Sequence, residues 1–218
     1  MQLAMPFAPQ TSYHAADFIP GDANAQALAL VERWPDWPYS IVLLHGPAGS
    51  GKTHLAHVFA ERARAHMLSP ARVGAAPADQ LLTGNHSWVL DGIEQVSDEA
   101  ALAQLINHAR ARGDYLLLTA TTSASQLPLT LPDLSSRLKA LPSVALTTPD
   151  EALLAGVMAK SFSDRQLRIP PDLMDYAINR MERSFEAVQQ FATAVDALSL
   201  ARGRAITQAL VREALGHG

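Results

Sequence analysis

The stretch that decides the fold of this chain reads Gly46-Pro47-Ala48-Gly49-Ser50-Gly51-Lys52-Thr53. It matches the phosphate-binding pattern G-x-x-x-x-G-K-[ST] at every required position. An apolar run at residues 41–44 precedes it and is typical of a buried strand, while residues 54–64 have helical spacing without a breaker. Because strand, glycine-rich loop and helix follow one another in the required order, the sequence predicts a P-loop nucleotide site.

The chemistry of this loop suits a phosphate chain. Glycines let backbone N–H groups turn inward around phosphate oxygens, and a helix N-terminus adds partial positive charge. Lys52 is predicted to reach the β- and γ-phosphates, and the Thr53 hydroxyl to bind Mg²⁺. We therefore predict ADP or ATP, with Mg²⁺, as the cofactors. The loop residues predicted to contact the nucleotide are Gly46, Pro47, Ala48, Gly49, Ser50, Gly51, Lys52, Thr53 and His54.

The composition is that of a globular chain. Its 218 residues suit one domain with a small appendage, or two small domains sharing a core. Hydrophobic residues make up 48%, and the absence of cysteine excludes disulfides and thiolate metal sites. No apolar stretch approaches the roughly 18 residues of a membrane span, so we expect a cytoplasmic protein without a membrane partner. The net charge of −4 argues against a large nucleic-acid footprint, so no direct sequence-specific DNA binding is expected.

Strand-like and helix-like segments alternate up to about residue 148. Strands are predicted at residues 41–44, 66–68, 88–90, 115–119 and 144–146, and helices at residues 25–33, 53–64 and 99–112. Such alternation favours an α/β fold with a parallel sheet covered by helices.

The pattern changes at Thr148-Pro149-Asp150-Glu151, which has the form of a capping box with proline at the first helical position. Leu154, Met158 and Phe162 follow at four-residue spacing and predict one buried helix face. Only helices are predicted from there, to about residue 164 and then at residues 171–180, 184–200 and 206–215. We therefore predict a flexible peptide at residues 1–10, a P-loop α/β domain at 11–148 and a small all-helical lid domain at 149–218.

A second element of the nucleotide site is predicted where the strand at residues 88–90 ends in Asp91. This carboxylate is expected to hold Mg²⁺ through water. Active P-loop ATPases of this build usually carry Asp or Glu at the next position, where it orients the attacking water, and this chain has Gly92 instead. Glu94 lies two residues further on and is expected to point elsewhere. We therefore expect weak or no intrinsic hydrolysis.

These features together resemble a known family. The P-loop, the Leu90-Asp91 strand end, the loop Leu131-Pro132-Asp133-Leu134-Ser135-Ser136-Arg137-Leu138 and the helical lid are similar to the AAA+ module of the bacterial replication initiator DnaA. The resemblance extends from about Phe18 to the C-terminus. It implies an AAA+ P-loop core followed by a helical lid. The initiator's N-terminal interaction domain and C-terminal DNA-binding domain are expected to be absent, a trimmed form that resembles the homologues which inactivate the initiator after replication starts.

The first residues, Gln2-Leu3-Ala4-Met5-Pro6-Phe7, resemble the hexapeptide with which replication proteins bind the DNA polymerase III sliding clamp. Leu3 and Phe7, with Met5 between them, suit an apolar pocket. The Gln2 amide can satisfy backbone groups at its rim, and Pro6 lowers the entropy lost on binding. An apolar terminus packed on its own domain is the alternative. The resemblance therefore implies the clamp, its beta subunit, as a partner.

The resemblance assigns Arg137 the role of an arginine finger that points into the nucleotide site of a neighbouring subunit. A guanidinium beside the γ-phosphate offsets charge developing on the transferred group. This implies an activator that acts in trans on ATP bound to DnaA, with ADP as its own structural nucleotide. A surface ion pair of Arg137 is the alternative. The sequence leaves a homodimer open.

At other positions of the family pattern, this chain has residues that match the family less closely. Thr121 stands where the family has a polar sensor residue, and Phe18 and Ile19 stand where it covers the adenine. The lid position that usually holds a phosphate-contacting arginine is aligned with Glu186, and Arg183 is the candidate replacement.

Two other functions stay open. One is a self-hydrolysing AAA+ ATPase such as a helicase loader, against which Gly92 and the lack of a basic single-strand-binding stretch argue. The other is a nucleotide-gated adaptor that recruits a partner to the clamp without a catalytic role.

Overall fold

The computed structural model describes residues 13–202 and 205–216. The chain divides into two compact units, with the boundary between Pro149 and Asp150. The unit up to Pro149 contains the whole sheet, and the unit from Asp150 onward contains only helices among its described residues. Each unit is described by itself below.

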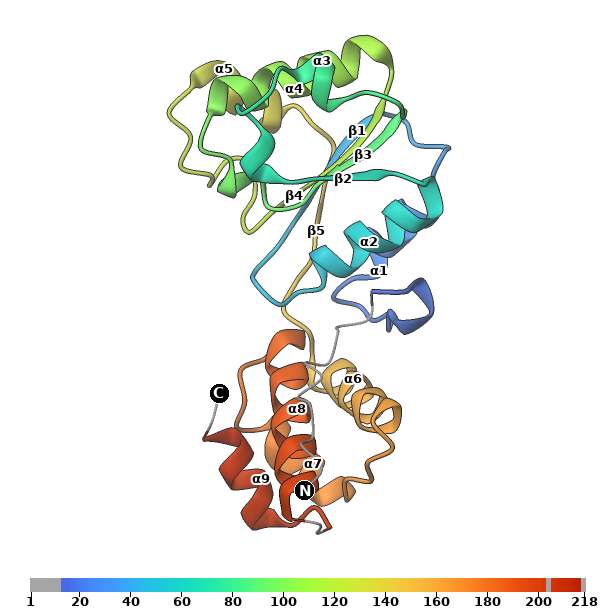
Figure 1. The fold of residues 1–218 in the computed structure, drawn as a ribbon, viewed down its shortest axis with the longest axis vertical. Helices are drawn as coiled ribbons and strands as arrows, with labels where there is room; N and C mark the ends of the chain where they lie inside the picture. Colours follow the sequence, from blue (N-terminus) through green and yellow to red (C-terminus); the bar gives the residue numbers. More distant parts are fainter. Residues whose placement is uncertain (1–12, 203–204, 217–218) are drawn as a thin grey trace, which may run out of the picture. The chain divides into compact units, whose positions relative to one another are not determined.

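The first unit is built on a sheet of five parallel strands in the order β2-β3-β4-β1-β5 (Figure 1). The strands are β1 (Ile41–His45), β2 (His66–Leu68), β3 (Ser87–Leu90), β4 (Tyr115–Ala120) and β5 (Ser143–Ala145). Parallel pairing requires crossover helices on the faces of the sheet, which is the alternation expected from the sequence. The predicted α/β architecture is confirmed.

Alternating strand residues face two separate hydrophobic clusters. Leu43, Leu90 and Leu118 belong to the cluster that includes residues of α3 (Ala78–Leu81), α4 (Glu99–Arg112) and α5 (Pro132–Lys139). Leu44, Val89 and Leu117 belong to the cluster that includes residues of α1 (Ala25–Glu32) and α2 (Lys52–Ala63). Both faces of the sheet are therefore covered, with α1 and α2 on one side and α3, α4 and α5 on the other (Figure 1). Burial on both faces explains why the central strands β1, β3 and β4 are mostly apolar.

The second unit consists of α6 (Glu151–Asp164), α7 (Pro171–Ile178), α8 (Phe185–Arg202) and α9 (Gln208–Leu215). Leu154, Met158 and Phe162 are buried in one cluster with residues of the other three helices. The four-residue spacing of these side chains predicted this common face. Among the described residues of the chain, no helix is long and apolar enough to cross a membrane.

Two local predictions were wrong. The N-cap of α6 is Asp150 rather than Thr148, because the Asp150 carboxylate accepts from Leu153 N at 2.7 Å. Aspartate is the better cap of the two. The segment 131–138, interpreted above as a loop, is mostly the helix α5. Pro132 sets its first turn, and Leu134 and Leu138, four residues apart, are both fully buried.

Candidate functional site

The P-loop lies at the carboxyl edge of the sheet, between β1 and α2. β1 pairs with β4 on one side and with β5 on the other. The connection from β1 runs to β2 on one side of the sheet and the connection from β4 runs to β5 on the other, so the loop after β1 lies at a topological switch point. Such points are where parallel α/β sheets bind ligands. Asp91, directly after β3, and Thr119, near the end of β4, belong to the same edge.

Gly46 is required by a close approach of two backbone segments. A Cβ atom added at this position would lie 2.3 Å from the carbonyl oxygen of Leu146, which follows β5. The backbone there is also pinned, since Gly46 N donates to Ala120 O at 3.2 Å and Leu146 N donates to His45 O at 2.7 Å. The absence of a side chain at the first glycine of the pattern therefore allows the start of the loop to pack directly against the segment after β5.

Lys52 is held inside the loop. Its Nζ donates to the carbonyl oxygens of Gly46 and Pro47, both at 2.7 Å, and the residue is only 9% exposed. Burial lowers the pKa of Lys52, and the carboxylates of Glu94 and Asp91 oppose that shift. An ammonium held by the loop's own carbonyls is positioned where a phosphate chain would enter the cradle. The residues present fit a nucleotide phosphate.

The buried hydroxyl of Ser50 fits the same interpretation. Ser50 is 1% exposed, and its Oγ has no hydrogen-bond partner among the described residues. Buried polar atoms are normally paired. A phosphate in the cradle is one group that can supply a partner to this loop.

Replacing Lys52 with alanine is expected to weaken ADP binding. The variant loses a charge-assisted contact of about 1.5–3 kcal/mol, so we expect the dissociation constant to rise tenfold or more in calorimetric titrations. Lys139→Ala, on the exposed side of α5, removes the same charge and serves as the control. An unchanged ADP affinity in Lys52→Ala would exclude this loop as the binding site.

Asp91 connects the P-loop helix with β4. Thr53 Oγ1 donates to Asp91 Oδ2 at 2.9 Å, and Thr119 Oγ1 donates to Asp91 Oδ1 at 2.6 Å. A threonine hydroxyl and a carboxylate are hard oxygen ligands of the kind that Mg²⁺ prefers. The pair Thr53 and Asp91, predicted separately from two motifs, is therefore brought together in an arrangement that fits Mg²⁺.

Thr119 is a site residue that the sequence interpretation missed. It is fully buried, and its Oγ1 also accepts from Gly92 N at 2.8 Å. Strand register is the reason for the contact, because Leu90 pairs with Leu118, which places Asp91 beside Thr119. Thr121, the residue predicted to contact the nucleotide, is exposed beyond the end of β4. Its nucleotide contact stays a prediction.

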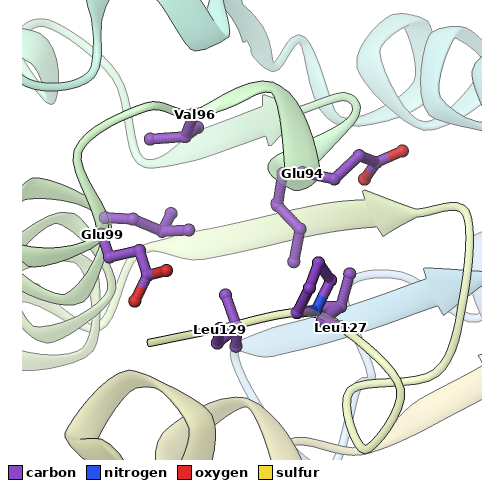
Figure 2. Close-up of a pocket in the computed structure, with 8 residues that line it drawn as sticks. Glu94, Val96, Glu99, Leu127 and Leu129 are labelled. Carbon is purple, nitrogen blue, oxygen red and sulfur yellow. The ribbon is translucent and has the colours of Figure 1, made fainter. Parts of the chain in front are cut away.

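Gly92 has a backbone conformation that explains the residue type. Its φ is +77°, in the left-handed region, where L side chains are strained. A Cβ atom there would also lie 2.5 Å from Gln95 Nε2, although that flexible side chain can move. Glu94, on the single turn 93–95, is exposed, and its carboxylate points away from Glu99 in Figure 2. The charge of Glu94 nevertheless acts on Lys52.

The segment before α1 lies against the helix that follows the P-loop. The Phe18 ring meets the His54 ring edge-on at 5.2 Å, and Tyr13 stacks on His57 at 4.4 Å. Ile19 is half-buried, and its carbonyl oxygen accepts from Asn24 Nδ2 at 3.1 Å. Phe18 thus lies beside His54, in the first turn of α2, and the predicted contact of Phe18 and Ile19 with the adenine stays a prediction. The buried Asn24, which shapes this segment, was missed by sequence interpretation.

Arg137 lies on α5, across the sheet from α2. Its Nε donates to Asp133 Oδ2 at 2.7 Å and its Nη1 donates to Asn107 Oδ1 at 2.7 Å. The hydrogen bond to Asp133 raises the pKa of Arg137. Among the residues that the structure describes, Nη2 has no hydrogen-bond partner, and the side chain is 32% exposed. Arg137 therefore forms the surface ion pair given as the alternative, with Asp133, and its Nη2 stays without a partner among the described residues.

The start of α5 is anchored by Glu99, the first residue of α4. Its carboxylate accepts from Thr130 N at 2.9 Å and from Leu131 N at 2.6 Å. Figure 2 shows this carboxylate beside Leu129, at the edge of a pocket. The pocket is lined by Ile93, Glu94, Val96, Glu99, Leu102, Leu127, Pro128 and Leu129. These backbone hydrogen bonds lower the pKa of Glu99.

The stabilising effect of Glu99 is expected to depend on pH. Because its folded pKa is depressed, the effect is fully present above the ordinary glutamate pKa of about 4.3 and is lost as pH falls through the folded value. Hydrogen exchange at the amides of Thr130 and Leu131 should therefore be faster in Glu99→Gln than in the parent near neutral pH. The two proteins should converge in strongly acidic solution. A constant difference at all pH values would contradict an ionised anchor.

The remaining predicted residues belong to the helical unit or are not among the described residues. In the helical unit, Arg183 Nη2 donates to Glu151 Oε1, and Glu186 Oε1 accepts from Gln190 Nε2 at 3.2 Å. The residues predicted to bind the clamp, Gln2, Leu3, Met5, Pro6 and Phe7, lie outside the described residues, so this stays a prediction.

Comparisons with known proteins place these features in a family. The family model of the bacterial DnaA ATPase domain matches residues 10–118, half of the chain. The DnaA initiator of Caulobacter sp. is 24% identical over 90% of this chain, which spans 46% of that protein. An uncharacterized protein of Haemophilus influenzae is 27% identical, with 89% of this chain and 90% of that protein covered. Domain III of the Thermotoga maritima initiator DnaA superposes with a TM-score of 0.81 at 14% identity, covering 94% of this chain and 96% of that one.

The fold and the P-loop site define an AAA+ domain with C-terminal helices. The chain belongs to the bacterial DnaA ATPase-domain family and is a distant homologue of the replication initiator. It spans about half the length of the initiators that it matches. This family assignment indicates nucleotide binding.

Proposed function

We propose that this chain is a regulator of the Hda type, which inactivates DnaA by promoting hydrolysis of its bound ATP. It binds ADP at its own P-loop with Mg²⁺, held by Thr53 and Asp91. It docks on the DNA polymerase sliding clamp through residues 2–7, and it inserts Arg137 into the nucleotide site of the initiator.

The observation that carries the proposal is the geometry of Arg137. Its guanidinium is held by Asp133 and Asn107, while Nη2 is open among the described residues. A planar cation held in this manner suits contact with phosphate oxygens of another molecule. Its position across the sheet from α2 suits action in trans.

The P-loop side of the proposal rests on Asp91 and Gly92. Asp91 lies beside Thr53, as a Mg²⁺ site requires, but the next residue lacks the carboxylate that would orient an attacking water. Thr53 and Asp91 would hold Mg²⁺, which would supply positive charge beside the phosphates. With no orienting base at position 92, the chain's own nucleotide serves to fix conformation rather than to be consumed.

ATP turnover measured in two settings tests the proposal. The purified chain alone is expected to bind nucleotide with almost no turnover, whereas chain added to clamp-loaded DNA and ATP-bound initiator should accelerate ADP formation. Turnover near one per second by the chain alone, abolished by Lys52→Ala, would instead establish a self-hydrolysing ATPase. Clamp binding without acceleration would establish a non-catalytic adaptor.

A further inference from the structure

One face of α4 contacts α5, the helix that holds Arg137, and the segment just before it. Glu99, Ala103 and Asn107 follow at four-residue spacing, which places them on the same side of the helix. Ala103 is buried in the cluster that includes Leu134 and Leu138 of α5. Glu99 binds the backbone just before α5, and Asn107 binds the Arg137 guanidinium. This stripe of α4 is therefore the support on which α5 lies.

We propose that Asn107 is a positioning residue for Arg137, fixing the direction in which the finger leaves the domain. The inference rests on the proposed function, because it assigns Arg137 the role of finger. The contact is short, at 2.7 Å between Asn107 Oδ1 and Arg137 Nη1, and it joins residues on different helices.

The chemistry of the two acceptors explains why Asn107 matters apart from Asp133. Asp133 lies four residues before Arg137 on the same helix, so it moves with α5, and its charge partly neutralises the guanidinium. Asn107 is neutral and belongs to α4, whose Leu105, Ile106 and Ala109 are fully buried. It therefore ties the guanidinium to the core without lowering its net charge. A catalytic group displaced by about 1 Å can lose on the order of a hundredfold in rate.

Three variants of α4 test the proposal in the initiator assay. Asn107→Leu keeps the size of the side chain and removes the acceptor, Asn107→Asp keeps an acceptor oxygen, and Gln104→Ala changes an exposed position of the same helix. With the full chain, clamp-loaded DNA and ATP-bound initiator, Asn107→Leu should lower the maximal rate of ADP formation about 10- to 100-fold. The concentration giving half-maximal rate should stay unchanged. Asn107→Asp keeps the acceptor but adds a negative charge that partly neutralises the guanidinium, so its rate should lie between those of Asn107→Leu and the parent. Gln104→Ala should match the parent.

A nitrogen-15 NMR measurement on the chain alone separates this inference from the proposed function. A hydrogen bond at Nη1 hinders rotation about the Nε–Cζ bond, so the parent should give two resolved Nη signals for Arg137, identified by their loss in Arg137→Ala. Asn107→Leu should merge them, and Asn107→Asp and Gln104→Ala should not. Separate signals in Asn107→Leu would overturn the inference. So would a parent-like maximal rate in that variant, provided that Arg137→Ala is impaired. If the parent itself does not accelerate ADP formation, the proposed function fails, while the NMR result still decides whether Asn107 orders Arg137.

Discussion

Replacing Arg137 with alanine is expected to slow the stimulated hydrolysis of initiator-bound ATP by roughly 10³-fold or more. Arginine fingers contribute about 10³–10⁵ in rate because the cation offsets charge that develops in the transition state. The effect should appear as lost conversion of ATP to ADP on the initiator, measured with clamp-loaded DNA present. Arg137→Lys should rescue poorly, since a point charge cannot reproduce the planar guanidinium fork.

The control for this prediction comes from the same helix. Lys139→Ala also removes one positive charge from the exposed surface of α5 and should convert ATP at the parent rate. In Arg137→Ala, ADP affinity and clamp binding should both stay at parent values, because α5 lies across the sheet from the P-loop helix. If Arg137→Ala converts ATP as fast as the parent, the chain supplies no finger and the adaptor function replaces the proposed one.

Replacing Leu3 and Phe7 together with alanine is expected to abolish clamp binding. Buried apolar anchors of this kind contribute about 2 kcal/mol each or more, so the dissociation constant should rise about a thousandfold. Surface plasmon resonance on immobilised clamp measures this loss. Without docking, stimulated hydrolysis should fall in parallel, although Arg137 is unchanged.

Gln10→Ala, a polar change outside the hexapeptide, is the matched control and should bind the clamp normally. The double variant should keep the parent's ADP affinity and melting temperature, because the proposal gives these side chains to the clamp rather than to the core. A drop of several degrees in melting temperature, with clamp binding retained, would assign them to the domain itself.

Local sequence patterns were sufficient to predict the sheet and the P-loop. Hydrophobic runs such as residues 41–44 and 88–90 become strands buried on both faces. Thr53 of the motif bonds Asp91, and the charge of Asp91 acts on Lys52, because the carboxyl ends of parallel strands lie at one edge of the sheet. Helix ends were less accurate where two capping residues compete, as Thr148 and Asp150 do.

Contacts between distant segments could not be predicted. Thr119 meets Asp91 only through the register of β3 and β4. Asn107 and Arg137 are 30 residues apart, and Glu99 and Thr130 are 31 residues apart. Neither pair carries a motif, since an asparagine or glutamate within a helix is ordinarily a solvated residue. Such partners emerge only when α4 and α5 are packed together.

The left-handed backbone at Gly92 bears on whether a carboxylate could be introduced at this position. Aspartate or glutamate at this position would introduce about 1–2 kcal/mol of backbone strain. The hydrogen bond from Gly92 N to Thr119 Oγ1 holds the backbone in this left-handed conformation. Under the proposed function, a substitution that supplies an orienting carboxylate at position 92 therefore also lowers the stability of the fold, so hydrolysis is gained only at the expense of stability.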